Sequence, residues 1–180
     1  MTRLILYACP RGVLATQIKT YLQLTQQRYG PNAAHAYMPH CTLTGFFSDQ
    51  ESAISGYVKT LEKVWGKHLQ DSPKASIEIE QMLFRENWHG LALRANWLKR
   101  LTAEFAQQAD SQTRPEAIRL KDWLHLSLAY DFNPEDGPKL QQLATELIDP
   151  SATVDWEMRF YQRSEQQQWT CHRSWPIEDK

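Results

Sequence analysis

Apolar and polar positions fall into short periodic stretches that proline, glycine and polar residues separate. Residues 3–8 are almost continuously apolar and the run stops at Pro10, which predicts a buried strand. Residues 13–29 place apolar side chains at helical spacing among Gln, Lys and Thr until Gly30-Pro31 ends the pattern. We therefore expect an amphipathic helix directly after the first strand.

Later stretches continue this alternation of strands and helices. Helical spacing returns in three places, at 54–65, 97–108 and 134–148. Apolar runs or alternating patterns predict strands at 40–47, 75–84, 88–95, 124–130, 153–161 and 168–175. The pattern predicts an α+β protein, because strands and helices both recur along the whole chain.

The order of these elements repeats. The strands that open the two halves begin at Arg3 and near His89, and the motif histidines His40 and His125 are 85 positions apart. We interpret this spacing as an internal duplication, roughly 1–86 and 87–180, within one domain that spans 1–180. A pseudo-two-fold axis would carry one equivalent strand from each half to facing walls of a shared groove.

Two short motifs occupy matching places in these halves. They read His40-Cys41-Thr42-Leu43 and His125-Leu126-Ser127-Leu128. Side chains alternate faces along a strand, so each histidine shares a face with the hydroxyl two positions on. A similar pair at His172 has no counterpart in the other half. We interpret His40 and His125 as one site, whereas the competing interpretation makes both of them structural histidines bonded to backbone carbonyls.

Composition narrows the class of partner. The chain has 180 residues, 20 Lys plus Arg and 21 Asp plus Glu, so its formal charge is −1. This balance disfavours DNA, a long RNA or a membrane surface as partner. Cys9, Cys41 and Cys171 are unpaired in spacing, which favours a reducing cytoplasm. No apolar run approaches the roughly 20 residues of a membrane span, and we expect a cytoplasmic monomer.

The motifs resemble the signature motifs of the two-histidine phosphoesterase superfamily, which includes bacterial RNA-ligase-like proteins and plant and fungal cyclic phosphodiesterases. The segments are 39–43 and 124–130, and Tyr130 matches a tyrosine that follows the serine in the cyclic phosphodiesterase branch. That branch commonly continues with glycine, whereas this chain has Asp131. The resemblance implies a bilobal fold of two mainly antiparallel sheets, with helices outside and a central groove.

The resemblance also implies a function. It implies metal-independent hydrolysis of 2',3'-cyclic phosphates of nucleotides or RNA ends, with the 2'-phosphate as the expected product and a role in RNA processing. His40 and His125 would be the base and the acid, because imidazole titrates near neutrality. Thr42, Ser127 and Tyr130 would hold the phosphate oxygens. Strict alternation places Tyr130 opposite Ser127, so its part in the site requires a β-bulge or the strand end. No cofactor or metal is needed.

A nucleotide base also needs an apolar or aromatic surface, which stacking makes favourable by about 1–3 kcal/mol. Proximity to the motifs, or the matching strand, makes four aromatic residues candidates: Phe46, Phe47, Trp123 and Trp156. We take Phe47 and Trp123 as the substrate-binding pair. Lys121 and Arg94 are candidate sources of positive potential.

Three other classes compete with this interpretation. A nucleophilic serine enzyme is disfavoured because the chain lacks a Gly-x-Ser-x-Gly elbow. A metal site from His40, His125 and Cys171-His172 lacks typical ligand spacing. The third is a nucleotide-binding or RNA-end-binding module, or an RNA-joining protein, with little hydrolytic activity. Two histidines with two hydroxyls favour catalysis, since Lys or Arg bind phosphate more simply.

Overall fold

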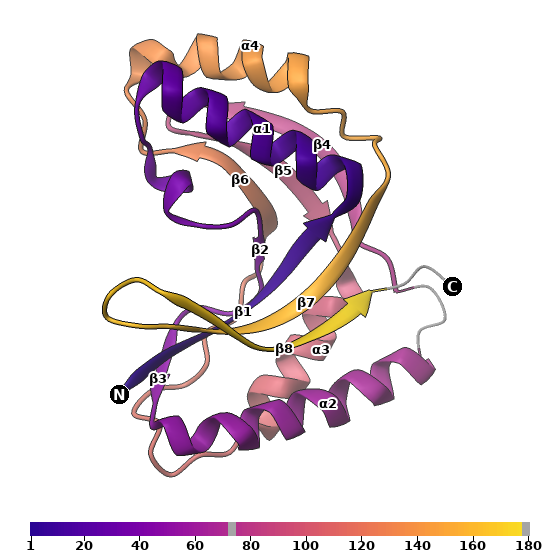
Figure 1. Ribbon diagram of the computed structural model, residues 1–180. Coiled ribbons are helices and arrows are strands. Elements are labelled where there is room, and N and C mark those ends of the chain that lie inside the picture. Colours follow the sequence, from indigo (N-terminus) through magenta and orange to yellow (C-terminus); the bar gives the residue numbers. More distant parts are fainter. Residues whose placement is uncertain (72–74, 178–180) are drawn as a thin grey trace.

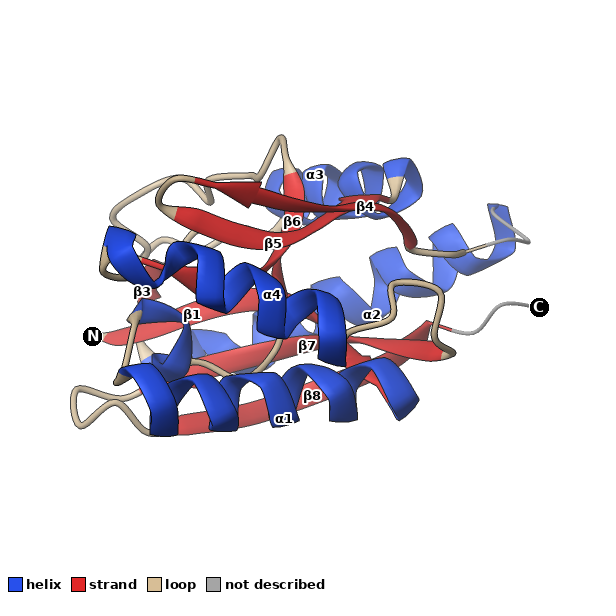
Figure 2. Cartoon of the chain, turned by 90° about the horizontal axis from the view of Figure 1, so that it is seen from above, coloured by secondary structure: helices blue, strands red, loops and turns tan. Residues whose placement is uncertain are grey.

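An antiparallel sheet with helices packed on it forms the framework of the protein (Figures 1 and 2). The computed structural model describes residues 1–71 and 75–177. The strands are β1 Thr2–Arg11, β2 Cys41–Thr42, β3 Phe47–Asp49, β4 Glu78–Arg85, β5 Trp88–Arg94, β6 Leu124–Tyr130, β7 Val154–Arg163 and β8 Trp169–Ile177. The helices are α1 Gly12–Tyr29, α2 Ile54–Asp71, α3 Asn96–Gln108 and α4 Gly137–Leu147, with short 3₁₀ helices η1 Ala33–Ala36, η2 Glu51–Ala53 and η3 Pro134–Asp136.

The strands form one sheet, in the order β4-β5-β6-β2-β1-β7-β8, with β3 paired to β1. The expected α+β class is confirmed, but the expectation of two separate sheets is wrong. Cys41 of β2 pairs with Leu126 of β6, so the two motif strands themselves join the halves. Consequently His40, directly before β2, and His125, within β6, lie on neighbouring strands at the middle of the sheet.

The strand order is symmetric about this central pair. Strand β1 corresponds to β5, β2 to β6 and β4 to β7. When each strand is exchanged with its counterpart, the order β4-β5-β6-β2-β1-β7 is read in reverse and is otherwise unchanged. The helices follow the same exchange, since α1 packs beside α4 and α2 beside α3. Figure 1 shows these two helix pairs at opposite ends of the molecule. Only β8 and β3 have no counterpart among the described strands.

Both faces of β1 are buried, as its continuously apolar run predicts. Leu4 and Leu6 belong to a large core that also takes in buried residues of β5, β6 and all four helices. Ile5, Tyr7 and Cys9 alternate with them and form a smaller cluster on the opposite face. The first face anchors the helices, and the second face leads toward the motif histidines.

The first motif strand is shorter than the predicted 40–47. The Leu6 amide donates to the Thr44 hydroxyl at 3.1 Å, and the amides of Leu43 and Thr44 both bond to the Leu6 carbonyl. A side chain thus replaces a backbone acceptor in the ladder, so pairing with β1 is interrupted after Thr42 and resumes at Phe47. The other predicted strands and three of the predicted helices occur within a few residues of their expected bounds, whereas α2 continues past the expected end at Trp65 to Asp71.

A buried carboxylate fastens the segment that precedes β6. Asp49 is fully buried and accepts hydrogen bonds from the Tyr57 and Thr113 hydroxyls and the Gln50 amide. Burial alone would raise the pKa of Asp49, but bonds from these groups and Ser111 outweigh it and lower the pKa to about 2. Asp49 therefore ties β3 and α2 to the chain that leads into the second motif.

Within the described part of the chain, none of the helices has the length and apolarity needed to cross a bilayer.

Candidate active site

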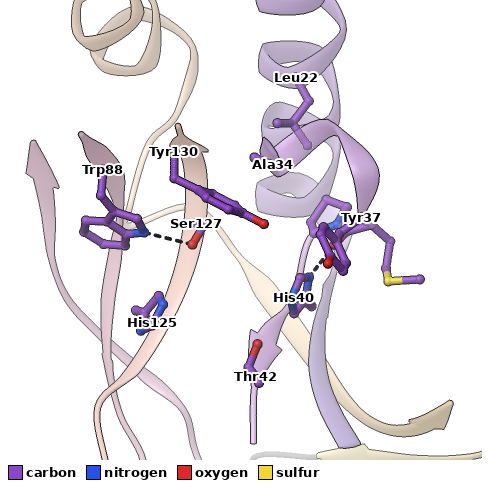
Figure 3. A pocket seen from close by; sticks show the side chains of 11 residues that line it. Leu22, Ala34, Tyr37, His40, Thr42, Trp88, His125, Ser127 and Tyr130 are labelled. Carbon is purple, nitrogen blue, oxygen red and sulfur yellow. Dashed lines mark hydrogen bonds between the residues drawn. The ribbon is translucent and has the colours of Figure 1, made fainter. Parts of the chain in front are cut away.

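The two motifs meet in a pocket of about 220 Å³. One wall carries His40 and Thr42, and the other carries His125, Ser127 and Tyr130 (Figure 3). The remaining lining side chains are Leu22, Ala34, Tyr37, Met38, Pro39 and Trp88. The structure therefore brings together all four motif residues that the sequence predicts and adds Tyr130 to them.

Both histidines are held by the same local bond. His40 Nδ1 lies 2.7 Å from the Met38 carbonyl, and His125 Nδ1 lies 3.2 Å from the Trp123 carbonyl. A carbonyl only accepts, so Nδ1 carries the proton in each ring. In the neutral imidazoles Nε2 is then left as a proton acceptor. The competing interpretation, histidines bonded to backbone carbonyls, describes one nitrogen of each ring and leaves the other available for chemistry.

His40 is packed among aromatic rings. Tyr7 lies 4.0 Å and Tyr37 5.5 Å away between ring centroids. Burial, opposed by the bond to the Met38 carbonyl and aided by the nearby His125, lowers the pKa of His40 to about 4. His40 is therefore neutral at pH 7 in the unliganded protein.

His125 contacts two indoles, whose ring centroids are themselves only 5.0 Å apart. Trp123 stacks on it at 4.2 Å with an interplanar angle of 29°, and Trp88 meets it edge-on at 5.3 Å. Burial lowers the pKa of His125, the Trp123 carbonyl opposes that shift, and the positive charges of Lys121 and Arg85 reinforce it. The unliganded pocket thus contains two imidazoles that both favour the neutral form.

The two motif hydroxyls differ in their hydrogen bonds. Trp88 Nε1 donates to Ser127 Oγ at 2.9 Å. No hydrogen bond joins the Thr42 hydroxyl to another of the described residues, so it is available to a ligand. Both hydroxyls line the same pocket as the histidines, which is the placement that strand alternation predicts.

Tyr130 reaches the pocket through a β-bulge. His89 pairs with Ala129 but Gly90 pairs with Ser127, so β6 has one extra residue, Leu128, opposite β5. The burial pattern of β6 changes phase at Leu128 and Ala129, both buried, which returns Tyr130 to the face of Ser127. The β-bulge that strict alternation requires for Tyr130 to take part in the site is therefore present.

The four aromatic candidates lie in different parts of the structure. Phe47 is 1% exposed and packs on Tyr57 and Phe160 in the core, so its prediction as a substrate-binding residue is wrong. Trp156 is likewise buried in the core. Trp123 is 40% exposed and lies behind His125, outside the pocket lining. Phe46 packs against Trp169 in the smaller cluster.

Among the aromatic lining residues, sequence reasoning missed Trp88 and Tyr37. The Tyr37 hydroxyl accepts a hydrogen bond from Arg163 Nη1 at 3.1 Å, and the guanidinium lies about equally close to the rings of Tyr37 and Trp169, at 4.9 and 5.0 Å from their centroids. Tyr37 stands in the loop before the first motif, where no periodic signal exists. Trp88 opens a predicted strand, but its position beside Ser127 depends on the pairing of β5 with β6.

The remaining candidates lie elsewhere. Arg94 forms ion pairs with Glu78 and Glu80, whereas Lys121 is exposed and close enough to His125 to affect its pKa. His172 bonds Gln162 on β7 and is not part of the pocket. No group of three or more His, Cys, Asp or Glu side chains with a geometry for metal binding occurs in residues 1–71 and 75–177.

Fold and site together describe an α+β protein with two histidine–hydroxyl walls around one central pocket. No protein-family model matches the chain. Ecdysteroid-phosphate phosphatase of Bombyx mori is 28% identical over 162 residues, covering 88% of this chain and 24% of that protein. Ubiquitin-associated and SH3 domain-containing protein B of Homo sapiens is 31% identical over 163 residues, covering 88% and 24%.

A second ecdysteroid-phosphate phosphatase, from Drosophila melanogaster, is 27% identical over 197 residues. The chain spans about a quarter of the length of these relatives. Their names describe the whole proteins.

Proposed function

We propose that the protein hydrolyses 2',3'-cyclic phosphates of nucleotides or RNA ends, without a metal, and releases 2'-phosphates. The observation that carries this proposal is the paired geometry of His40 and His125. Each imidazole is held through Nδ1 by the carbonyl two residues earlier, and each lines the same pocket beside a hydroxyl side chain. This arrangement suits a reaction that needs one base and one acid at the same phosphorus atom.

The reaction requires two proton transfers. Nε2 of one histidine takes a proton from water, and the water oxygen bonds to phosphorus as the bond from phosphorus to the ribose 3' oxygen breaks. Nε2 of the other histidine, in its protonated form, gives its proton to that leaving oxygen. Each positioned transfer is worth about 10²- to 10⁴-fold in rate. The two histidines end with their protonation states exchanged, and exchange with solvent restores them.

The acid must acquire its proton in the complex. In the unliganded pocket burial lowers the pKa of both histidines. A cyclic phosphate is an anion, and an anion beside an imidazole raises its pKa by favouring the charged form. Binding of the substrate therefore supplies the protonated histidine that the reaction needs.

Hydroxyl groups would hold the non-bridging oxygens. Thr42 and Ser127 stand beside the two histidines, and Tyr130 lines the same pocket. Their O–H groups can donate where negative charge gathers in the transition state. The resemblance to two-histidine phosphoesterases and the phosphatase names of two relatives support phosphoester chemistry in general, and the cyclic substrate rests on the paired histidines.

A nucleotide-binding or RNA-end-binding module is the second candidate. The lowered pKa of both histidines favours it, because a pocket in which both imidazoles stay neutral has no acid and would hold phosphate through its hydroxyl groups without turnover. The two candidates differ in turnover and agree in binding.

Turnover of the four nucleoside 2',3'-cyclic monophosphates with EDTA present tests the proposal. We expect His40→Ala and His125→Ala each to lower kcat by about 10²- to 10⁴-fold. His172→Ala is the matched control, since His172 bonds Gln162 outside the pocket, and it should retain wild-type activity. Phosphorus NMR identifies the product. A wild-type protein that binds these nucleotides without turnover would overturn the enzyme in favour of the binding module.

A further inference from the structure

Trp88 occupies space that a side chain at Gly90 would otherwise fill. A Cβ atom built on Gly90 would lie 2.4 Å and 2.7 Å from two ring carbons of Trp88. Gly90 pairs with Ser127 across β5 and β6, so the indole lies over the backbone position opposite that serine. The missing side chain at position 90 lets the ring reach the pocket.

From this place the indole contacts both functional groups of the second motif. Its Nε1 donates to Ser127 Oγ at 2.9 Å, and its ring meets His125 edge-on at 5.3 Å and 88°. Figure 3 shows Trp88, Ser127 and His125 on the same side of the pocket. Tryptophan has one polar hydrogen and no acceptor, so it can act on Ser127 only as a donor.

The consequence concerns the direction of the Ser127 proton. A free serine hydroxyl rotates and can either donate or accept. When one lone pair accepts from Trp88, the serine's own O–H turns away from the indole. The hydroxyl then has a donor direction left for the pocket, where a phosphate oxygen needs a donor.

We propose that Trp88 is a positioning residue, which fixes Ser127 as a hydrogen-bond donor toward the phosphate group of the substrate. This inference rests on the proposed function. Trp88 acts through Ser127, so its indole N–H should matter only while the serine hydroxyl is present. That dependence separates positioning from a general packing role.

A double-mutant cycle with Trp88→Phe and Ser127→Ala tests this dependence. Trp88→Phe keeps an aromatic ring and removes the donor, and we expect kcat to fall roughly 5- to 10-fold with little change in KM. In the Ser127→Ala background the same change should alter kcat by less than about 2-fold. Equal effects in the two backgrounds would overturn the proposal.

Trp123→Phe is the matched control. Trp123 also packs on His125, but its side chain does not bond Ser127. Its effect on kcat should therefore be the same with and without the serine hydroxyl. A Trp123 effect that also vanished in the Ser127→Ala background would show that any ring beside His125 couples to Ser127, which contradicts a specific role for the indole N–H of Trp88.

A second readout requires no substitution of Trp88. The indole ¹⁵N–H resonance of Trp88 should shift and exchange faster with solvent in Ser127→Ala, while the Trp123 resonance should not. An unchanged Trp88 resonance would overturn the proposal even if Trp88→Phe fails to fold.

Measurements with inorganic phosphate distinguish a failure of the Trp88 proposal from a failure of the proposed enzyme activity. If the wild type turns over cyclic phosphates and the kcat effects are additive, the role of Trp88 fails and the enzyme stands. If the wild type is inert, the enzyme fails, and the cycle is repeated on the dissociation constant for inorganic phosphate. The coupling should then appear in binding, and its absence, or an absence of phosphate binding, would overturn the role of Trp88.

Discussion

The two walls of the pocket share a backbone plan and differ in how they hold their imidazoles. Opposite Thr42, β1 carries Tyr7, whose ring packs directly on His40 at 4.0 Å. Opposite Ser127, β5 carries Gly90, and the Trp88 ring takes the vacant space beside His125. Both solutions place an aromatic ring against the histidine.

Their difference lies in the hydroxyls. The Trp88 ring brings an N–H to Ser127 Oγ, whereas the Tyr7 ring brings no donor to Thr42. On the first wall an oriented O–H comes instead from Tyr37, which accepts from Arg163. Repetition of a motif therefore preserves the histidine geometry, and the surrounding residues decide which hydroxyl is oriented.

Gly90→Ala would disrupt the second wall of the pocket, and among the proposed variants it should cause the largest loss of stability. The new Cβ would lie 2.3 Å from the Leu126 carbonyl oxygen, as well as against the Trp88 ring. We expect the free energy of unfolding to fall by about 3 kcal/mol, because a backbone atom cannot move aside without disturbing the pairing of β5 with β6.

Urea denaturation measures this loss, with Gly66→Ala as the control. Gly66 lies in α2 and a Cβ there meets no other atom within 4 Å, so the substitution should leave stability unchanged or raise it by up to about 1 kcal/mol. Equal stability of the two variants would show that the indole does not depend on the bare backbone at Gly90.

Asp49→Asn tests how the walls are held relative to each other. The pKa of Asp49 is about 2 in the folded protein, below its ordinary value of 3.8, so ionised Asp49 stabilises the fold above pH 4. That shift corresponds to about 2 kcal/mol, which the asparagine would lose.

The pH dependence gives the sign. Stabilisation by Asp49 should diminish as pH falls from about 4 toward 2, because in this range the carboxyl group binds a proton in the unfolded chain, whereas in the folded protein it does so only near pH 2. Urea denaturation of both proteins at pH 7 and at pH 2.5 should show a difference that shrinks in acid. A difference that stays constant over this range would contradict the role of the charge.

Tyr37→Phe tests the oriented hydroxyl of the first wall, and its expected effect is the smallest of the three. The Tyr37 hydroxyl accepts from Arg163 and therefore has its own proton to offer the pocket. Its loss should weaken binding of adenosine 2'-monophosphate about 5-fold, as expected for one hydrogen bond near 1 kcal/mol. Titration calorimetry measures this affinity. Tyr29→Phe, near the end of α1 and outside the pocket, is the control. Equal affinity of both variants would remove Tyr37 from the site.

Local periodicity predicts much of this molecule. Alternation along a strand is a backbone property, so it correctly places His40 with Thr42 and His125 with Ser127. It also assigns Phe47 to the face of Cys41 and Leu43, which is the core side. The wrong prediction for Phe47 came from proximity to the motif, a weaker criterion than alternation.

Local sequence patterns do not predict which distant strands pair, or in which register. The bulge at Leu128 that returns Tyr130 to the pocket depends on the register with β5, as does the place of Trp88 beside Ser127. The single sheet likewise follows from one pair, Cys41 with Leu126. Such contacts depend on chain segments far apart, which no local pattern specifies.

The proposed function requires His40 and His125 to contact the same phosphate group from facing walls. Imidazole ¹⁵N and ¹H resonances followed against pH, with and without adenosine 2'-monophosphate, test it directly. In the unliganded protein both rings should carry the proton on Nδ1, and His40 should titrate near pH 4. Binding should raise the pKa of both histidines and leave His172 unchanged. A ligand that shifts only one of the two, or neither, would contradict the shared site.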